Sequence, residues 1–295
     1  MRYAYPSQRL QDWLSQRWVM LRGRRVDLAD VAWLAAPFGD VDVIADTYVE
    51  RLASNEDLLV ERDAAAGLLP SIRDLLGGEA PRVHPQIAAF YEHTTEHDLD
   101  VWSEWCGAFR PFAVLINLLY SRRLQQLNLP LRPLDTARGL TSEIIRLRER
   151  ATGRLRYTIW FRRLKATGRV VYSGIYGTTT LPDGRRCAKI VFPLPRGNAT
   201  VVLAPRVDED GALHLESSGR EFGDAGFYFL LRDASGAHWA QYIRSFREHI
   251  TVFVDDEGVL RTDHRLSVWR RLALHMHYRL TRRPPPSRPA IARAG

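Results

Sequence analysis

Residues 155–161, LRYTIWF, decide the fold class of this chain. Apolar or aromatic side chains at every second position alternate with Arg156, Thr158 and Trp160. A period of two is typical of a β-strand, because successive side chains point to opposite faces of a sheet. Residues 187–194, CAKIVFPL, repeat the pattern. The sequence therefore predicts a strand at each of these places.

Turn sequences separate the alternating segments at short intervals. They are PDG at 182–184, GN at 197–198, DEDG at 208–211 and DDEG at 255–258. Asp, Asn and Gly suit tight turns, either through local hydrogen bonds or through freedom at positive φ. We predict eight to ten strands between residues 153 and 280, joined as hairpins into a strongly curved antiparallel sheet or β-barrel.

The pattern before residue 153 differs, because its apolar residues recur at helical spacing. Examples are DVDVIADTYVERLA at 40–53, AAAGLLPSIRDLLGG at 64–78 and GAFRPFAVLINLLYSRRLQQL at 107–127. A proline-punctuated connection follows at 129–140. The expected fold class is α+β: a mainly helical region over 1–152, an antiparallel β-rich cup or barrel over 153–281, and a disordered, basic, proline-rich tail over 282–295.

Composition restricts the class of protein. The chain has 295 residues, 45% of them apolar and 26% charged, which suits a folded protein with a sizeable core. Its longest apolar run, residues 112–120, is shorter than the roughly 20 residues of a membrane-spanning helix, and no segment resembles a signal peptide. Cys106 and Cys187 are expected to be buried free thiols. These features predict a cytoplasmic protein.

The charge is unevenly distributed along the chain. Residues 1–150 carry a net charge of −3 and residues 151–295 carry +11, which together give +8. A basic half could dock on an anionic membrane surface or partner. A general compositional bias toward arginine, or arginines that solvate the outside of a sheet, would explain the charge equally well. No nucleic-acid-binding module is recognisable, so we expect no nucleic acid partner.

Residues 90–105, FYEHTTEHDLDVWSEW, contain an H-x-x-E-H spacing at His93, Glu96 and His97. On a helix, both histidines would lie opposite the apolar stripe that contains Trp102. Zinc ligands normally point into a supported interior, so this geometry favours a solvated face. A zinc hydrolase through His93, Glu96 and His97 is kept as a minor alternative; otherwise we expect neither metal nor cofactor.

The last predicted strand, VWRRLALHMHYRL at 268–280, carries two histidines on one face. His275 and His277 alternate with an apolar face that includes Met276 and Tyr278. Their face is either solvated or turned into the cup. In the second case both imidazoles would be neutral at pH 7 and could act as general bases.

Further candidates lie elsewhere in the β-rich half. The loop SSGREFGDAGFYF at 217–229 is no nucleotide fingerprint, because no helix follows it. Its Asp224 either hydrogen-bonds its own backbone or lies at the barrel mouth near His264 of TDHRL. The candidate catalytic residues are His275, His277, Asp224 and His264. The candidate ligand-binding residues are Tyr228, Trp239, Tyr242, Arg244 and Trp269.

Several long blocks of the chain resemble a known family. They include HPQIAAFYEHTTEHDLDVWSEW, KIVFPLPRGNATVVLAP, GREFGDAGFYF and LRTDHRLSVWRRLALHMHYRL, spread over residues 83–280. These blocks are similar to the soluble part of YndJ-like proteins, a family of uncharacterised bacterial proteins. This resemblance implies no catalytic or binding residue. A more distant likeness to bacterial domains of unknown function with a curved antiparallel sheet supports the architecture only.

Three functions remain open from the sequence. The β-rich cup could bind an apolar or aromatic, acidic small molecule, with rings on its walls and arginines for the charge. The same cup could be a cofactor-independent acid–base enzyme, such as an isomerase, cyclase or hydrolase. The third is a non-catalytic protein that docks on an anionic membrane surface or partner. We rank ligand binding first, with or without catalysis.

Overall fold

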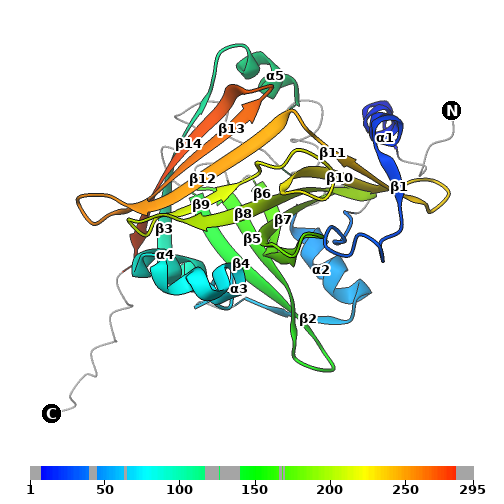
Figure 1. Ribbon diagram of the computed structural model, residues 1–295. Helices are drawn as coiled ribbons and strands as arrows, with labels where there is room; N and C mark the ends of the chain where they lie inside the picture. The colour runs from blue at the N-terminus through cyan, green and yellow to red at the C-terminus, as the bar shows by residue number, and fades with distance from the viewer. Residues whose placement is uncertain are drawn as a thin grey trace.

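The computed structural model describes residues 8–39, 45–62, 65–116, 126, 140–165, 168 and 170–283. Its dominant feature is one 14-stranded antiparallel sheet, most of which curls into a barrel (Figure 1). Ten strands form the closed wall. Around the wall they are β3 (His97–Trp105), β4 (Leu140–Glu149), β5 (Leu155–Leu164), β6 (Val170–Thr180), β7 (Arg186–Leu194), β8 (Gly197–Val207), β9 (Leu213–Glu216), β12 (Phe246–Val254), β13 (Leu260–Val268) and β14 (Arg271–Arg282).

The short strand β9 closes the barrel. It pairs with β8 on one side and with β12 on the other, while β14 pairs with β3 and β3 with β4. The first half of β8 pairs instead with β10 (Gly226–Arg232). The sheet therefore forks at β8, and the branch continues through β11 (His238–Tyr242) to β1 (Arg24–Val26). The strand β2 (Leu58–Glu61) lies beside β4.

Short helices cover the barrel at several places. They are α1 (Leu10–Arg22), α2 (Ala45–Asn55), α3 (Arg73–Leu76), α4 (Pro85–Glu92) and α5 (Phe109–Ile116), with 3-10 turns η1 (Gly77–Arg82) and η2 (Thr94–Glu96). The segment with α3 and α4 lies at the lower end of the barrel in Figure 1. Its Leu75, Ile87 and Phe90 share a buried core with inward residues of the wall such as Val201 and Leu203.

The wall beneath α2 is buried on both faces. Tyr48 and Val49 of α2 pack in one buried cluster with Ile159 and Phe161 of β5. The alternating residues of β5, Trp160 and Arg162, line the interior. The strand predicted from LRYTIWF is thus confirmed. Both of its faces are buried, because helix and cavity contact it from opposite sides.

The β-rich half contains the predicted antiparallel strands, but it does not form the barrel alone, because β3 and β4 complete the wall. Ten strands, β5 to β14, follow residue 153. Gly184, Gly211 and Gly258 occupy three of the predicted turns at φ 86°, 80° and 75°. The fourth turn was misplaced by two residues: residues 197–198 begin β8, and the turn contains Arg196 at φ 56°.

The prediction of a mainly helical region before residue 153 holds only in part, because β1 to β4 also lie there. Residues 97–105 form β3 and not the expected amphipathic helix. Over so short a stretch the apolar pattern fits both the helical period and the strand period of two. Residues 97–105 form a strand because nine of them pair in register with β14. Gly153, read as the point where the structure changes, lies at φ 69° in the turn between β4 and β5.

Some predictions fall outside the described residues. These are most of the connection at 129–140, the helix beyond residue 116 and the tail from residue 284. Cys106 and Cys187 are free thiols, as expected, and only Cys187 is buried. Among the described residues, no helix has the length and apolar character needed to cross a membrane.

Candidate functional site

The interior of the barrel contains a cavity of about 650 Å³. Alternate residues of the wall strands line it, such as Ile190 and Phe192 of β7 and Met276 of β14. Phe90 of α4 lines one part, and Phe109 of α5 another. A volume of this size falls within the roughly 300–1,000 Å³ typical of small-molecule sites.

The cavity wall is predominantly apolar and aromatic. Its rings come from the wall strands, from the branch strand β10 and from the helices α1, α4 and α5: Trp18, Phe90, Tyr91, Trp105, Phe109, Trp160, Tyr176, Phe192, Phe227, Phe229, Phe246 and Tyr278. Water in such a space finds few hydrogen-bonding partners, so an apolar guest is favoured over solvent. The few polar side chains are therefore the groups that would fix the orientation of a guest.

His264 and Glu248 form a polar pair on the cavity wall. His264 of β13 lies opposite Ile250 of β12, two residues along the strand from Glu248, so His264 and Glu248 are diagonal neighbours on the inner face. His264 Nε2 lies 2.6 Å from Glu248 Oε1, and their side chains are only 14% and 12% exposed. If Nε2–H donates to the carboxylate, Nδ1 is the nitrogen left to accept a proton.

Arg162 brings a positive charge to the same cavity. Its side chain is fully buried and projects inward from β5. Its guanidinium carbon lies 4.5 Å from the ring centroid of Trp160 and 5.3 Å from that of Tyr278. Stacking of this kind stabilises a guanidinium where water is scarce. The charge favours an anionic group on any ligand that enters.

The two histidines of β14 lie outside the cavity. Met276 and Tyr278 line the interior, and alternation therefore places His275 and His277 on the outer face. His275 Nε2 contacts Asp263 Oδ1, and its ring meets the edge of Trp102. Burial lowers the pKa of His277. Of the two orientations left open by the sequence, the outward one is correct, because the apolar face of β14 faces the interior.

Asp224 organises its own loop. Its Oδ2 accepts the backbone N–H groups of Arg220 at 2.7 Å and Glu221 at 3.1 Å. The backbone oxygen of Asp224 accepts the hydroxyl of Tyr228 at 2.5 Å. These contacts match the turn-forming alternative, since carboxylates in Gly-rich loops commonly bind local backbone donors.

The predicted ligand-binding residues also lie away from the cavity. Tyr228 is buried in a separate cluster on the branch of the sheet, and Tyr242 donates to the carbonyl of Gly219 at 2.7 Å. Trp239 donates to Asp233 at 2.8 Å. Arg244 is exposed, and Trp269 is 73% exposed at a turn with φ 49°. Tyr228 lies on the face of β10 opposite to Phe227 and Phe229, which do line the cavity. Trp269, expected in the last strand, lies instead in the turn between β13 and β14.

The H-x-x-E-H residues do not converge. His93 is exposed after the end of α4, whereas His97 is buried at the start of β3. His97 Nδ1 lies 3.1 Å from the carbonyl oxygen of His93, and burial lowers the pKa of His97. Glu96 forms an ion pair with Arg282 at 2.8 Å. The helical spacing that would bring the histidines together is absent.

Of the predicted residues, only His264 lines the cavity, and sequence reasoning missed its partners. Glu248 lies in FREHITVFV, whose alternation Phe246, Glu248, Ile250 places a carboxylate on an otherwise apolar face. This single carboxylate on an apolar strand face was the feature of the sequence that could have identified Glu248 as a cavity residue. Arg162 gave a similar one, since it follows Trp160 on the inner face of β5.

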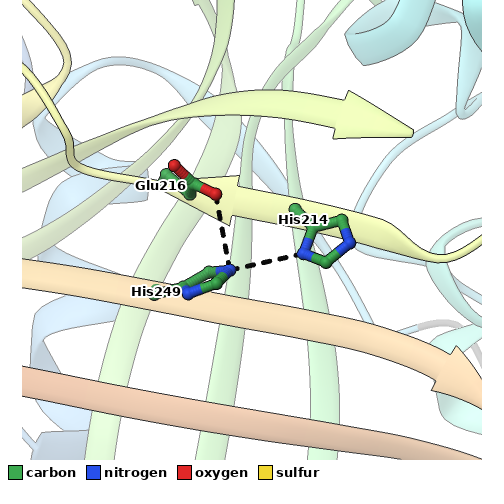
Figure 2. Close-up of side chains that lie close together, drawn as sticks. All are labelled: His214, Glu216 and His249. Carbon is green, nitrogen blue, oxygen red and sulfur yellow. Dashed lines mark hydrogen bonds and ion pairs between the residues drawn. The ribbon is translucent and has the colours of Figure 1, made fainter. Parts of the chain in front are cut away.

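A second polar group lies on the outer face of the wall. His214 and Glu216 of β9 and His249 of β12 point toward one another (Figure 2). Their ligand atoms all lie within 4.8 Å, which among the described residues makes them the one group of three that could hold a metal ion. Two imidazoles and a carboxylate form a donor set that zinc accepts.

Comparison with known proteins confirms the resemblance noted from the sequence. The chain is 29% identical over 153 residues to the "Uncharacterized membrane protein YndJ" of Bacillus subtilis (strain 168). The match covers 51% of this chain and 27% of YndJ, so the chain spans well under two thirds of that relative. No family model matches the chain, and no solved structure matches it significantly.

Proposed function

We propose that this protein binds an apolar or aromatic small molecule with an acidic or hydrogen-bonding group inside the barrel. The observation that carries the proposal is the cavity of about 650 Å³ with apolar walls and a few inward polar side chains. Binding would bury most of the ligand surface, and each Å² of apolar area removed from water contributes roughly 25 cal/mol.

Two polar elements would orient the ligand. Arg162 supplies a fixed positive charge, and the pair of His264 and Glu248 supplies a hydrogen-bonding edge. An acidic head group near Arg162 would pair with the guanidinium charge, and the apolar body of the ligand would pack against the rings of β7 and β14. Such a ligand resembles an aromatic sulfonate or a long-chain carboxylate.

Native mass spectrometry and probe binding test this proposal. Anilinonaphthalene sulfonate and a polyene fatty acid should bind with 1:1 stoichiometry and gain fluorescence. His264→Ala should weaken binding at least several-fold, whereas the outward control His277→Ala should leave it unchanged. Saturable binding that responds equally to both variants, or no binding by either probe, would contradict the proposal.

Acid–base catalysis in the same cavity is an extension that the pair of His264 and Glu248 favours. A carboxylate that holds an imidazole in one tautomer is a common arrangement for a general base. Any molecule that purifies with the protein can be incubated in D₂O, and deuterium uptake followed by mass spectrometry. Glu248→Gln should abolish uptake while binding persists. Uptake that is unaffected by this variant would leave only a binding function.

Docking on an anionic membrane is a second candidate, favoured by the surface of α1. Leu10, Leu14 and Leu21 are 51%, 53% and 82% exposed, and arginines flank them. Amphipathic helices of this kind bind anionic interfaces. Co-sedimentation with vesicles that contain phosphatidylserine tests it, with Leu21→Gln as the variant. A cytoplasmic location stays a prediction, since the similar YndJ is named a membrane protein.

A further inference from the structure

The outer face of the barrel carries a site that is separate from the cavity. The strands β9 and β12 are antiparallel neighbours, with His249 opposite Glu216 and Thr251 opposite His214. Directly opposite residues project from the same face of a sheet, with their Cβ atoms about 5 Å apart. The backbone register itself therefore gathers these four side chains, as Figure 2 shows for three of them.

We propose that His214, Glu216 and His249 bind a zinc ion. His214 Nδ1 lies 3.3 Å from His249 Nε2, and His249 Nε2 lies 3.5 Å from Glu216 Oε1. Two donors at 2.0–2.1 Å from a tetrahedral ion lie about 3.3–3.4 Å apart. Both spacings are close to those of neighbouring ligands of one zinc ion, and the ligand atoms of all three residues lie within 4.8 Å of one another.

A further residue orients His214 for this role. Asp208, in the turn before β9, accepts from His214 Nε2 at 2.9 Å. The other carboxylate oxygen of Asp208 accepts the backbone N–H of Ala212 at 2.8 Å. The His214 proton is therefore held on Nε2, and the lone pair of Nδ1 points toward His249. A carboxylate behind a histidine ligand is the usual support of zinc-bound imidazole.

The site is open on one side. The side chains of His249 and Glu216 are 43% and 34% exposed, whereas that of His214 is 14% exposed. Water can therefore complete a tetrahedral shell as the fourth ligand. Arg206 approaches Glu216 Oε1 at 3.7 Å and must yield this oxygen when a cation binds. The competing charge predicts an affinity below that of a closed structural zinc site.

Zinc at this position would join the two strands that close the barrel. The strand β9 has only four residues, and its pairing with β12 is one of the two contacts that complete the wall. Any ligand that binds only the folded state raises apparent stability by mass action. Zinc should therefore raise the melting temperature of the protein, which gives a readout independent of any activity.

The test uses the full chain, free of affinity tags and stripped of metal with a chelator. Equilibrium dialysis against Zn²⁺ with elemental analysis should give one tightly held ion per chain. His214→Ala and His249→Ala should each weaken binding at least 100-fold, and Asp208→Asn should weaken it 10- to 100-fold. His277→Ala, which removes another outward histidine, should leave the affinity unchanged.

Two further measurements guard against variants that fail to fold. Circular dichroism compares each variant with the wild type, and Co²⁺ added to the wild type should give the intense visible absorption of a tetrahedral site. Zinc retention unaffected by His214→Ala and His249→Ala in folded protein would overturn the proposal. So would an absence of stoichiometric zinc and of the tetrahedral Co²⁺ spectrum in the wild type.

Discussion

An enlarged side chain on the cavity wall should keep or raise the free energy of unfolding, whereas the same enlargement in a packed core should lower it. Ala188 in β7 lines the cavity on the same face as Ile190 and Phe192. Ala240 is fully buried in the packed cluster around Tyr228. The substitutions Ala188→Phe and Ala240→Phe are therefore chemically identical and differ only in the space that receives the ring.

The magnitudes follow from the surroundings. A benzene-sized ring occupies on the order of 150 Å³, so the cavity of about 650 Å³ can accept it. Burying a phenyl ring contributes about 2 kcal/mol, less up to about 1 kcal/mol for lost rotamer freedom. Ala188→Phe should leave the free energy of unfolding unchanged or raise it by up to about 2 kcal/mol. Overpacking at Ala240 should lower it by about 1–3 kcal/mol.

Urea unfolding with linear extrapolation measures both variants against the wild type. Probe titration then measures occupancy, and Ala188→Phe should weaken binding of anilinonaphthalene sulfonate at least tenfold while Ala240→Phe leaves it within a factor of two. Equal destabilisation by the two variants would refute the reasoning, since it would mean that the space beside Ala188 is already filled.

Three further outcomes are expected. Burial lowers the pKa of Lys189 to about 8, so between about pH 8 and 10 the unfolded state binds more protons and the free energy of unfolding should rise with pH. Urea titrations should show that the wild type gains on the order of 2 kcal/mol over Lys189→Met in this window. A difference between the two proteins that stays constant with pH would contradict the prediction. Asp224→Ala should lower the free energy of unfolding by about 1–2 kcal/mol in thermal unfolding and leave the affinity for the probe unchanged. Loss of probe binding would instead indicate that Asp224 takes part in ligand binding. Gly153→Ala should lower the free energy of unfolding by about 1 kcal/mol, because Gly153 has a φ of 69°. Gly78→Ala is the control, and an equal loss of stability in both variants would contradict the strained position of Gly153 in the turn between β4 and β5.

The local pattern was enough to predict the strands and most turns. Residues 155–161 and 187–194 alternate because each side chain of a strand faces one of two surfaces, and this is a property of neighbouring residues. The glycines at 184, 211 and 258 mark turns because their backbones take positive φ. The resemblance to YndJ was likewise legible in the sequence.

The sequence failed where two periods fitted equally well or where distant strands had to meet. Residues 97–105 are short enough to read as helix or strand, and only pairing with β14 settles them. The same applies to the faces of β14: its apolar face was recognised, but the closure of the barrel determines that this face is the inside.

Both candidate sites depend on such long-range pairings. His264 and Glu248 meet through the ladder between β12 and β13, and His214, Glu216 and His249 through that between β9 and β12. The sequence alone determined which residue types were available and how each strand alternates. Only the tertiary structure decided which of them converge, because register and closure are set by the packing of the whole sheet and not by the spacing of residues along the chain.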